Sequence, residues 1–304
     1  MKGKPLSIDP MDGQTILITG GTGTFGQTAT ARLLLQTDLR QLRILSRGEH
    51  RQAEMAARFP DRRLRFLIGD IRDRERLGLA FRGVDLVFHA AALKRVEKCE
   101  YDPDEAVKTN ICGTANVIHA ALGAGSRVVF LSSDKACAPV TLYGFTKAAA
   151  EHYVLKANAY VGGLPRFSVM RYGNVAGSQG SVIPLWRRLA DEGRKLPITD
   201  LRMTRFWMTI SEAVDFALWV ARQPAGQTYV PRMPSFKLVD LAFAIQRNTT
   251  PLDVIWMRGV EKLHEDIVAP YETKIVSPWG GPMSSDKNTD WLDVAELTKR
   301  LEGV

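Results

Sequence analysis

Short apolar runs alternate with longer amphipathic segments over the first 171 residues of the chain. Each run is four to six residues long, as expected of a strand buried on both faces. The segments between them are long enough for helices, including 72–81 and 102–122. Strands that alternate with helices predict an α/β fold with a doubly wound parallel sheet. The predicted strands are 14–19, 42–46, 64–68, 86–89, 127–131 and 167–171.

A glycine-rich turn separates the first predicted strand from the first helix. Its sequence is T-G-G-T-G-T-F-G, and the three glycines that follow the G-x-x-G-x-x-G spacing allow a tight turn and a close backbone approach. The N-terminus of the following helix then faces a pyrophosphate. Between a strand and a helix, this spacing predicts a dinucleotide-binding Rossmann domain. The expected contacts are Gly20, Thr22, Gly23, Thr24, Phe25 and Gly26.

The residues after the second strand bear on the choice of cofactor. An acidic residue there usually binds the ribose 2′-hydroxyl, but this chain has Ser46 and Arg47. A guanidinium favours a 2′-phosphate, so we expect NADP rather than NAD. The alternative is that Arg47 is an ordinary surface arginine.

Three further segments are expected to complete the cofactor site. Asp70 and Ile71 follow the third strand, and Asp70 either accepts a hydrogen bond from the adenine amino group or caps the helix over 72–81. Ala90, Ala91 and Ala92 follow the fourth strand, where small residues let the backbone pass close to the cofactor. Lys94 is expected to face both cofactor and sugar, and Asn110 to brace the loop after the strand 127–131.

The strand 127–131 leads into the stretch that carries the candidate catalytic residues. Ser133, Asp134 and Lys135 stand at its carboxyl end, where ligands bind in open α/β sheets. Tyr143 and Lys147 are four residues apart on the next predicted helix and share one face. A lysine beside a phenol lowers the tyrosine pKa, which suits a general base acting on an alcohol. The alternatives are a solvated Y-x-x-x-K face and a surface Asp-Lys ion pair.

The chain is less regular beyond about residue 177. We therefore predict a nucleotide-binding domain over 1–178, onto which 207–231 packs back, and a smaller substrate domain over 179–304. Residues 1–12 are expected to form a flexible arm. No internal repeat or low-complexity tract is present.

Composition narrows the choice of function. The 304 residues carry a formal net charge of +8, but the arginines are scattered and form no basic stripe with interleaved aromatics, which argues against nucleic-acid binding. A positive balance suits an anionic substrate such as a nucleotide sugar. The three cysteines and five histidines have no metal-ligand spacing, so no metal is expected. Without a signal peptide or a membrane-spanning run, we expect a cytoplasmic protein with no membrane insertion.

From about Thr15 to Leu301 the chain resembles the extended short-chain dehydrogenases, most closely the UDP-N-acetylglucosamine 4,6-dehydratases that invert C5. The Asp134-Lys135 pair is the discriminating feature, since dehydratases that retain C5 carry Asp-Glu and epimerases lack the pair. The resemblance implies an NADP-dependent lyase of polysaccharide biosynthesis that forms a homo-oligomer, a dimer or a hexamer. Matching motifs include G-D-I-R-D-R-E-R-L, H-A-A-A-L-K, S-S-D-K-A, Y-G-F-T-K, R-Y-G-N-V, M-T-R-F-W-M-T and E-K-L-H-E.

The resemblance also implies a role for each residue of the central stretch. Tyr143 would deprotonate the C4 hydroxyl, with Ser133 hydrogen-bonded near that oxygen. Lys147 would hold the nicotinamide ribose and lower the tyrosine pKa. Lys135, with a pKa lowered by neighbouring cations and burial, would remove the C5 proton. Asp134 would protonate the departing C6 hydroxyl.

A second set of residues is implied to bind the UDP-sugar. Guanidinium groups suit its pyrophosphate, while the alternatives are a turn asparagine and solvated arginines. The sequence departs from the family pattern at Val260, where glycine is usual, and the segment after Glu265, which belongs to the sugar-nucleotide lid, is shorter than usual. The implied residues are Lys94, Asn174, Val182, Thr204, Arg205, Arg258 and Glu261.

Other functions on the same fold remain open. One alternative is a nucleotide-sugar 4-epimerase or a 5,6-dehydratase, which differ from the 4,6-dehydratase in their product. Another is a non-catalytic NADP-binding sensor. Such sensors typically lack the tyrosine or the lysine of the catalytic pair, and this chain has both Tyr143 and Lys147.

Overall fold

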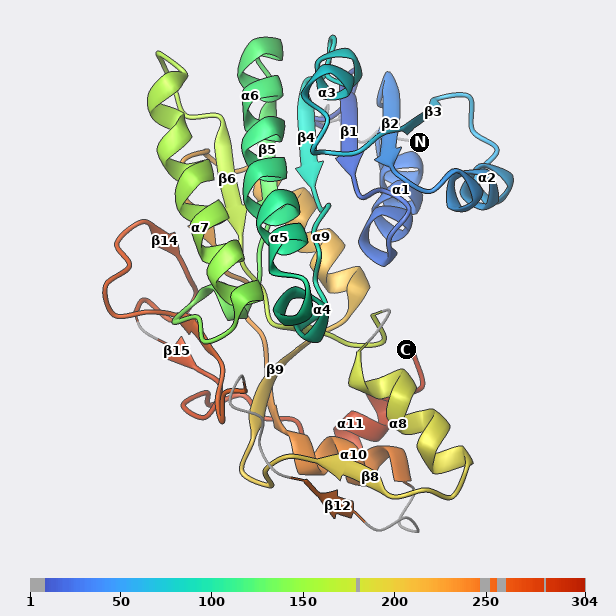
Figure 1. Ribbon diagram of the computed structural model, residues 1–304, viewed down its shortest axis with the longest axis vertical. Coiled ribbons are helices and arrows are strands. Elements are labelled where there is room, and N and C mark those ends of the chain that lie inside the picture. The colour runs from blue at the N-terminus through green and yellow to red at the C-terminus, as the bar shows by residue number, and fades with distance from the viewer. Residues whose placement is uncertain (1–8, 179–180, 247–251, 256–260, 282, 304) are drawn as a thin grey trace, which may run out of the picture.

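The computed structural model describes residues 9–178, 181–246, 252–255, 261–281 and 283–303. Within these ranges, eight strands form a parallel sheet in the order β14-β10-β6-β5-β4-β1-β2-β3 (Figure 1). The apolar runs of the sequence supply six of them, so the predicted doubly wound α/β class is confirmed. The strands are β1 Thr15–Thr19, β2 Gln41–Ser46, β3 Leu64–Ile68, β4 Leu86–His89, β5 Arg127–Leu131, β6 Phe167–Met170, β10 Thr228–Tyr229 and β14 Ile275–Val276.

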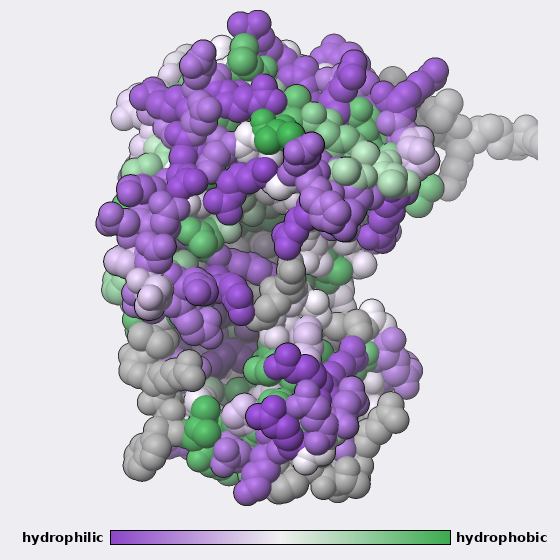
Figure 2. All heavy atoms as spheres, turned by 45° about the vertical axis from the view of Figure 1, so that its right-hand side comes forward, coloured by the Kyte–Doolittle hydropathy of each residue, from purple (hydrophilic) through white to green (hydrophobic). Residues whose placement is uncertain are grey.

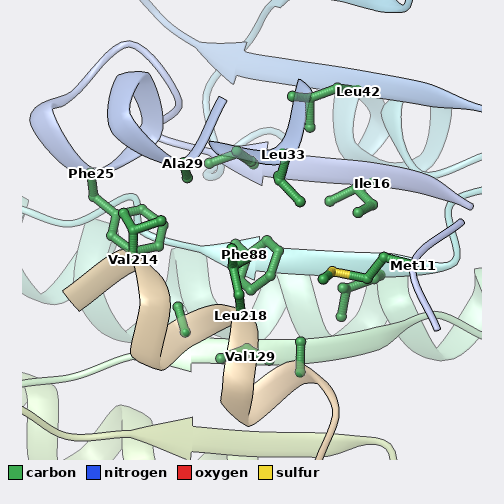
Figure 3. Packing of buried hydrophobic residues seen from close by; sticks show 14 of the residues in the cluster. Met11, Ile16, Phe25, Ala29, Leu33, Leu42, Phe88, Val129, Val214 and Leu218 are labelled. Carbon is green, nitrogen blue, oxygen red and sulfur yellow. The ribbon is translucent and has the colours of Figure 1, made fainter. Parts of the chain in front are cut away.

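Helices cover both faces of this sheet, because its strands are apolar on both sides. On one face, Phe25 and Leu33 of α1 and Val214 of α9 pack around Phe88 of β4 (Figure 3). On the other face, α3, α6 and α7 bury a second apolar cluster that includes Val117. The helices are α1 Thr24–Gln36, α2 Glu49–Arg58, α3 Arg74–Ala80, α4 Val96–Tyr101, α5 Pro103–Val107, α6 Thr114–Ala124, α7 Leu142–Lys156 and α9 Ile210–Ala221.

The smaller part of the molecule lies beyond the carboxyl ends of the central strands (Figure 1). A three-stranded sheet of order β11-β9-β7 packs with three helices around buried Trp186 and Trp207. The later half of the chain also returns to the large sheet through α9, β10 and β14. The elements are β7 Asn174–Val175, α8 Val182–Asp191, β8 Leu196–Ile198, β9 Thr204–Met208, β11 Ser235–Lys237, α10 Leu238–Gln246, β12 Leu252–Val254, β13 Asp266–Val268, β15 Met283–Ser284 and α11 Val294–Leu301.

Two local expectations were wrong. The helix predicted over 102–122 is interrupted by a π-helical turn at Lys108–Gly113, and such turns often mark functional positions. The arm predicted over 1–12 is fixed at its described end, because Met11 is 2% exposed in the core and the carboxylate of Asp9 accepts a hydrogen bond from Arg222. Burial of the Met11 side chain is favourable enough to hold the segment in place.

A buried ion cluster ties the sheet to the later half of the chain. Arg171, directly after β6, donates from Nε to Glu151 on α7 at 3.1 Å and from Nη1 to Glu272 at 2.9 Å. The same Nη1 donates to the carbonyl of Ile267 at 2.9 Å. The arginine side chain is 3% exposed, so its charge depends on these two carboxylates for compensation.

We predict that Arg171→Met lowers the free energy of unfolding by about 3–5 kcal/mol, because it leaves two buried carboxylates without a counter-charge. Urea unfolding followed by tryptophan fluorescence measures the change. The matched control is Arg202→Met, since Arg202 is 75% exposed in its pair with Asp200 and its loss should leave the free energy of unfolding nearly unchanged. Equal losses in the two variants would contradict the prediction.

Candidate active site

The loop after β5 holds its polar groups in a fixed turn. The hydroxyl of Ser133 accepts from the backbone N–H of Lys135 at 3.2 Å and caps the 3-10 turn Asp134–Ala136. The same hydroxyl donates to Asp134 Oδ1 at 2.8 Å. The backbone N–H of Asp134 donates to the carbonyl of Tyr172 at 2.9 Å, and the Asp134 carboxylate is 1% exposed. The turn therefore presents a buried acid at a defined position.

The ammonium of Lys135 lies between two buried carboxylates. Its Nζ is 3.2 Å from Asp134 Oδ1 and 3.2 Å from Glu265 Oε1, while Arg205 Nε is 3.7 Å from the same Glu265 oxygen. Burial lowers the pKa of Lys135, but the two carboxylates together outweigh it and raise the pKa above its ordinary value. The predicted lowering was wrong, because the decisive neighbours are anions rather than cations.

Tyr143 lies in the first turn of α7, whose N-terminus is capped by the hydroxyl of Thr141. Burial raises the pKa of the phenol to about 12, against the opposing charge of Lys135 and a hydrogen bond with Ser133. Lys147 was expected to lower this pKa, and that expectation was wrong. Its ammonium donates instead to the carbonyl of Leu131 at 2.6 Å, and its own pKa is lowered to about 7 by burial.

The glycine turn has no room for side chains at two positions. A Cβ on Gly20, whose φ is +66°, would lie 2.9 Å from the backbone of Ala91, and a Cβ on Gly26 would lie 2.2 Å from the carbonyl oxygen of Gly21. No side chain caps the N-terminus of α1 after Gly23, and no acidic residue occupies its first turn. The backbone N–H groups there are thus suited to an anionic group such as a pyrophosphate.

The residues expected around the adenosine half are found at the ends of β2 and β3. Arg47 is 62% exposed, with Nη1 3.9 Å from Asp70 Oδ2. Asp70 also accepts from Arg72 and is not a helix cap, since α3 is capped by Asp73. Ser46 Oγ accepts from Gln52 at 2.9 Å. Ile71 is 5% exposed, and Thr22 and Phe25 are also buried.

Asn110 braces the loop after β4, not the loop after β5 as expected. Its Oδ1 accepts from the backbone N–H of Leu93 at 2.8 Å, and its Nδ2 donates to the Leu93 carbonyl and to Thr146 on α7. Asn110 lies within the π-helical turn and is 1% exposed. Lys94, the next residue of this loop, is exposed.

A cavity of about 340 Å³ opens where the loop after β5 meets the smaller part of the chain. Figure 2 shows the surface hollowed between the two parts. Of the residues implied to bind substrate, Asn174, Val182, Arg205 and Glu261 line this cavity together with Lys135 and Glu265. Thr204 does not line it and is 4% exposed behind the wall, bonded to Ser285 Oγ at 2.6 Å. Arg258 lies outside the described residues.

The residues of the cavity wall carry buried polar atoms that have no hydrogen-bond partner among the described residues. Asn174 and Glu261 contribute acceptor oxygens, and Trp207 contributes an N–H donor. Ser181 Oγ and Glu265 Oε2 are also buried and have no hydrogen-bond partner among the described residues. Buried polar groups are nearly always hydrogen-bonded, so these atoms point to a polar ligand with several donors and acceptors.

Sequence reasoning missed Glu265. It lies at the end of the motif E-K-L-H-E, which carried the resemblance, but no pattern in the sequence indicates that its carboxylate reaches Lys135. The described residues contain no cluster of His, Cys, Asp and Glu that could hold a metal ion. No helix in the described ranges is long and apolar enough to cross a membrane.

Comparison with known proteins identifies the family. The model of a family described as polysaccharide biosynthesis protein matches residues 16–279. The chain belongs to this family. A Campylobacter jejuni protein named UDP-N-acetylglucosamine 4,6-dehydratase (inverting) is 47% identical over 262 residues, which are 85% of this chain and 78% of the relative. A Rickettsia akari protein named UDP-glucose 4-epimerase is 38% identical over 88% of this chain and 81% of its own length.

Solved structures agree on the fold of this family member. The structure of Pen from Bacillus thuringiensis is 33% identical, with a TM-score of 0.86 over 97% of this chain and 99% of Pen. DesIV from Streptomyces venezuelae, a dTDP-glucose 4,6-dehydratase, is 24% identical, with a TM-score of 0.74 over 82% of this chain and 86% of DesIV. The second similarity shows the shared fold alone.

We predict that Lys147 makes stability depend on pH. Burial lowers its folded-state pKa to about 7 from 10.5, so between these values the unfolded chain binds more protons and stability rises with pH. At about 1.4 kcal/mol per pKa unit, the gain from pH 7 to 10 is about 3 kcal/mol, and Lys147→Met lacks it. Urea unfolding at both pH values measures it, with Lys156→Met on the exposed face of α7 as control. An equal pH response in wild type and Lys147→Met would contradict the prediction.

Proposed function

We propose that the chain is an NADP-dependent UDP-N-acetylglucosamine 4,6-dehydratase that inverts C5. The observation that carries the proposal is the placement of Asp134 and Lys135 beside Tyr143, with Lys135 at the wall of the cavity. A dehydratase needs an acid, a base and an alcohol-oxidising tyrosine around neighbouring sugar carbons. The 47% identity to the named Campylobacter dehydratase supports this reaction.

The glycine turn fits a nicotinamide dinucleotide. Backbone atoms approach too closely at Gly20 and Gly26 for any side chain, and the uncapped N-terminus of α1 suits the pyrophosphate. When bound, the nicotinamide would accept a hydride from C4 and return it to C6. The exposed guanidinium of Arg47 would bind a 2′-phosphate, which is the reason for proposing NADP.

The first chemical step would remove the proton of the C4 hydroxyl. Burial keeps Tyr143 a neutral phenol, so it can accept the proton of the C4 hydroxyl only if it gives its phenolic proton to a neighbouring group. Ser133 bonds the phenol and donates to Asp134 Oδ1 at 2.8 Å. We propose that the proton passes through Tyr143 and Ser133 to Asp134, which thereby becomes the acid for the next step.

The second step would eliminate water across C5 and C6. The 4-keto group acidifies the C5 proton, Lys135 removes it, and Asp134 protonates the departing C6 hydroxyl. Reprotonation of C5 from the other face then gives the inverted 4-keto-6-deoxy sugar. Lys147, held by the Leu131 carbonyl, would contact the nicotinamide ribose.

The cavity would receive the UDP-sugar. Asn174, Val182, Glu261 and Arg205 line it. Asn174 and Glu261 each bring an oxygen that has no hydrogen-bond partner among the described residues, Val182 brings an apolar surface, and Arg205 brings a cation. Lys94, and Arg258 outside the described residues, would contact the same ligand. Thr204, placed behind the wall, would support the site rather than touch the sugar.

A 4-epimerase is the second candidate, because the rickettsial relatives carry that name. An epimerase oxidises and reduces C4 and needs no acid and base at C5 and C6, so it leaves Asp134 and Lys135 without a function. A 5,6-dehydratase would use the pair but release an exocyclic enol ether. A non-catalytic sensor has no use for the buried tyrosine and lysine.

Two further expectations stay predictions. Homo-oligomer formation, as a dimer or a hexamer, is tested by light scattering of the purified protein. A cytoplasmic location is tested by fractionation of the source cells.

We predict that the wild-type protein converts UDP-N-acetylglucosamine in deuterated water to a 4-keto-6-deoxy product with deuterium at C5, without net consumption of NADP. Lys135→Ala should still bind cofactor but lose more than about 100-fold in dehydration, the usual contribution of a general base. Mass spectrometry and NMR identify the product. Lys108→Ala, a change at an exposed lysine, is the control. A C4-epimerised sugar with no deuterium at C5 would favour the epimerase instead.

We predict that Arg47→Ala weakens NADPH binding by about tenfold, the loss of one charge-assisted interaction, and leaves NADH binding unchanged. Nucleotide fluorescence titrations measure both affinities. Arg51→Ala, at an exposed position on α2, controls for the loss of positive charge. Equal weakening for the two nucleotides would argue against a 2′-phosphate contact.

A further inference from the structure

We infer that Glu265 is the proton-accepting partner of Lys135, a positioning residue that turns the ammonium into an amine before the C5 proton is removed. The inference rests on the proposed dehydratase function and deepens it. It starts from a contact between segments far apart in the chain, since Lys135 follows β5 and Glu265 precedes β13.

Lys135 cannot act as a base in the arrangement shown. Its Nζ donates to Asp134 Oδ1 at 3.2 Å and forms an ion pair with Glu265 Oε1 at 3.2 Å, so it is a protonated ammonium without a free electron pair. Removal of the C5 proton requires the neutral amine. One proton must therefore leave Nζ first, and an acceptor within hydrogen-bond distance is needed.

Of the two carboxylates in contact, Glu265 is the one available. In the proposed sequence, Asp134 already holds the proton from the C4 hydroxyl, delivered through Tyr143 and Ser133. Glu265 is 3% exposed and is one of the residues that line the cavity, and its second oxygen, Oε2, has no hydrogen-bond partner among the described residues. A proton on Oε1 weakens only the contact of that oxygen with Arg205 Nε, which is 3.7 Å away.

The proton count closes with this assignment. An N–H bond of Lys135 breaks as an O–H bond forms on Glu265. The amine then takes the C5 proton while the C6–O bond breaks, and Asp134 gives its proton to the leaving hydroxyl, which departs as water. At the end C5 takes up a proton from solvent water and Glu265 releases its proton to solvent, so the two transfers balance. Lys135 is again an ammonium, and both carboxylates are again charged.

The transfer of a proton from Lys135 to Glu265 leaves the net charge of the surrounding cluster unchanged. Asp134 and Glu265 face Lys135 as anions, Arg205 faces it as a second cation, and the neutral phenol of Tyr143 completes the set. Arg205 is fixed by hydrogen bonds to three backbone carbonyls, those of residues 204, 262 and 263. Further along the cavity wall lie Glu97, Glu261 and Lys262.

Glu265 is also held rigidly. Its backbone N–H donates to Ser285 Oγ at 3.0 Å, and its carbonyl accepts from the backbone N–H of Ser285 at 2.8 Å. Ser285 Oγ in turn bonds Thr204 Oγ1 at 2.6 Å. This network gives Thr204 a structural role and fixes the carboxylate beside Nζ.

The test uses Glu265→Gln in the full-length protein. The amide keeps the size and the acceptor oxygen of the carboxylate but cannot hold the extra proton. We expect deuterium incorporation at C5 from deuterated water to fall by about 100-fold or more, with KM within about threefold of wild type. Single-turnover absorbance at 340 nm should still report oxidation at C4. C5 exchange in the variant should rise with pH, because solvent base must now take the proton, whereas the wild type stays nearly flat.

A structural role for Glu265 would not produce this pH response. Glu265→Asp, which keeps a carboxylate, should restore part of the exchange. Asp266→Asn removes the adjacent carboxylate, which pairs with Lys262 and not with Lys135, and should match wild type. NMR titration of ¹³C-labelled lysine gives a readout without substrate, in which Glu265→Gln should let Lys135 lose its proton at lower pH.

The outcomes distinguish a failure of the proposed dehydratase function from a failure of the role inferred for Glu265. Absence of conversion by the wild-type protein would overturn the proposed function and, with it, the role of Glu265. Wild-type conversion with unchanged C5 exchange and a flat pH profile in Glu265→Gln would overturn the inference alone. If Glu265→Gln does not fold, Glu265→Asp is compared with wild type in the C5 exchange assay and in the lysine titration. Full C5 exchange in Glu265→Asp, together with an unchanged titration of Lys135, would overturn the inference about Glu265.

Discussion

The ion pair between the ammonium of Lys135 and two buried carboxylates is the interaction on which the site depends. Asp134 comes from the loop after β5, and Glu265 comes from the segment before β13. A buried charge is tolerated only when it is paired and hydrogen-bonded, so the two segments must meet for either to be stable. The same pairing brings the end of the parallel sheet against the smaller part of the chain and closes the cavity between them.

This arrangement sets the protonation states before any substrate binds. Burial makes Tyr143 a weaker acid, and the two carboxylates make Lys135 a stronger base that is already protonated. Neither residue is ready for its proposed task by itself. Ser133 contacts the phenol of Tyr143 and donates to Asp134, and Lys135 forms an ion pair with Glu265, so each group has a neighbour that can supply or accept the missing proton.

A second buried cluster serves stability rather than chemistry. Arg171 joins Glu151 on α7 to Glu272 in the segment between β13 and β14, and none of the three residues lines the cavity. Like Lys135, it pairs one cation with two carboxylates from different segments. These two clusters, each with one cation between two carboxylates, explain how the irregular later half of the chain is fixed against the sheet.

The sequence by itself determined six of the eight strands of the central sheet, the glycine turn and the positions of Tyr143 and Lys147, because these depend on local periodicity and spacing. Only the tertiary structure decided the partners of the charged groups. It placed Met11 in the core, put a π-helical turn at Asn110 and reversed the expected pKa shift of Lys135. A pKa depends on burial and on charges that approach from distant segments, and no local pattern in the chain encodes the contact between Lys135 and Glu265.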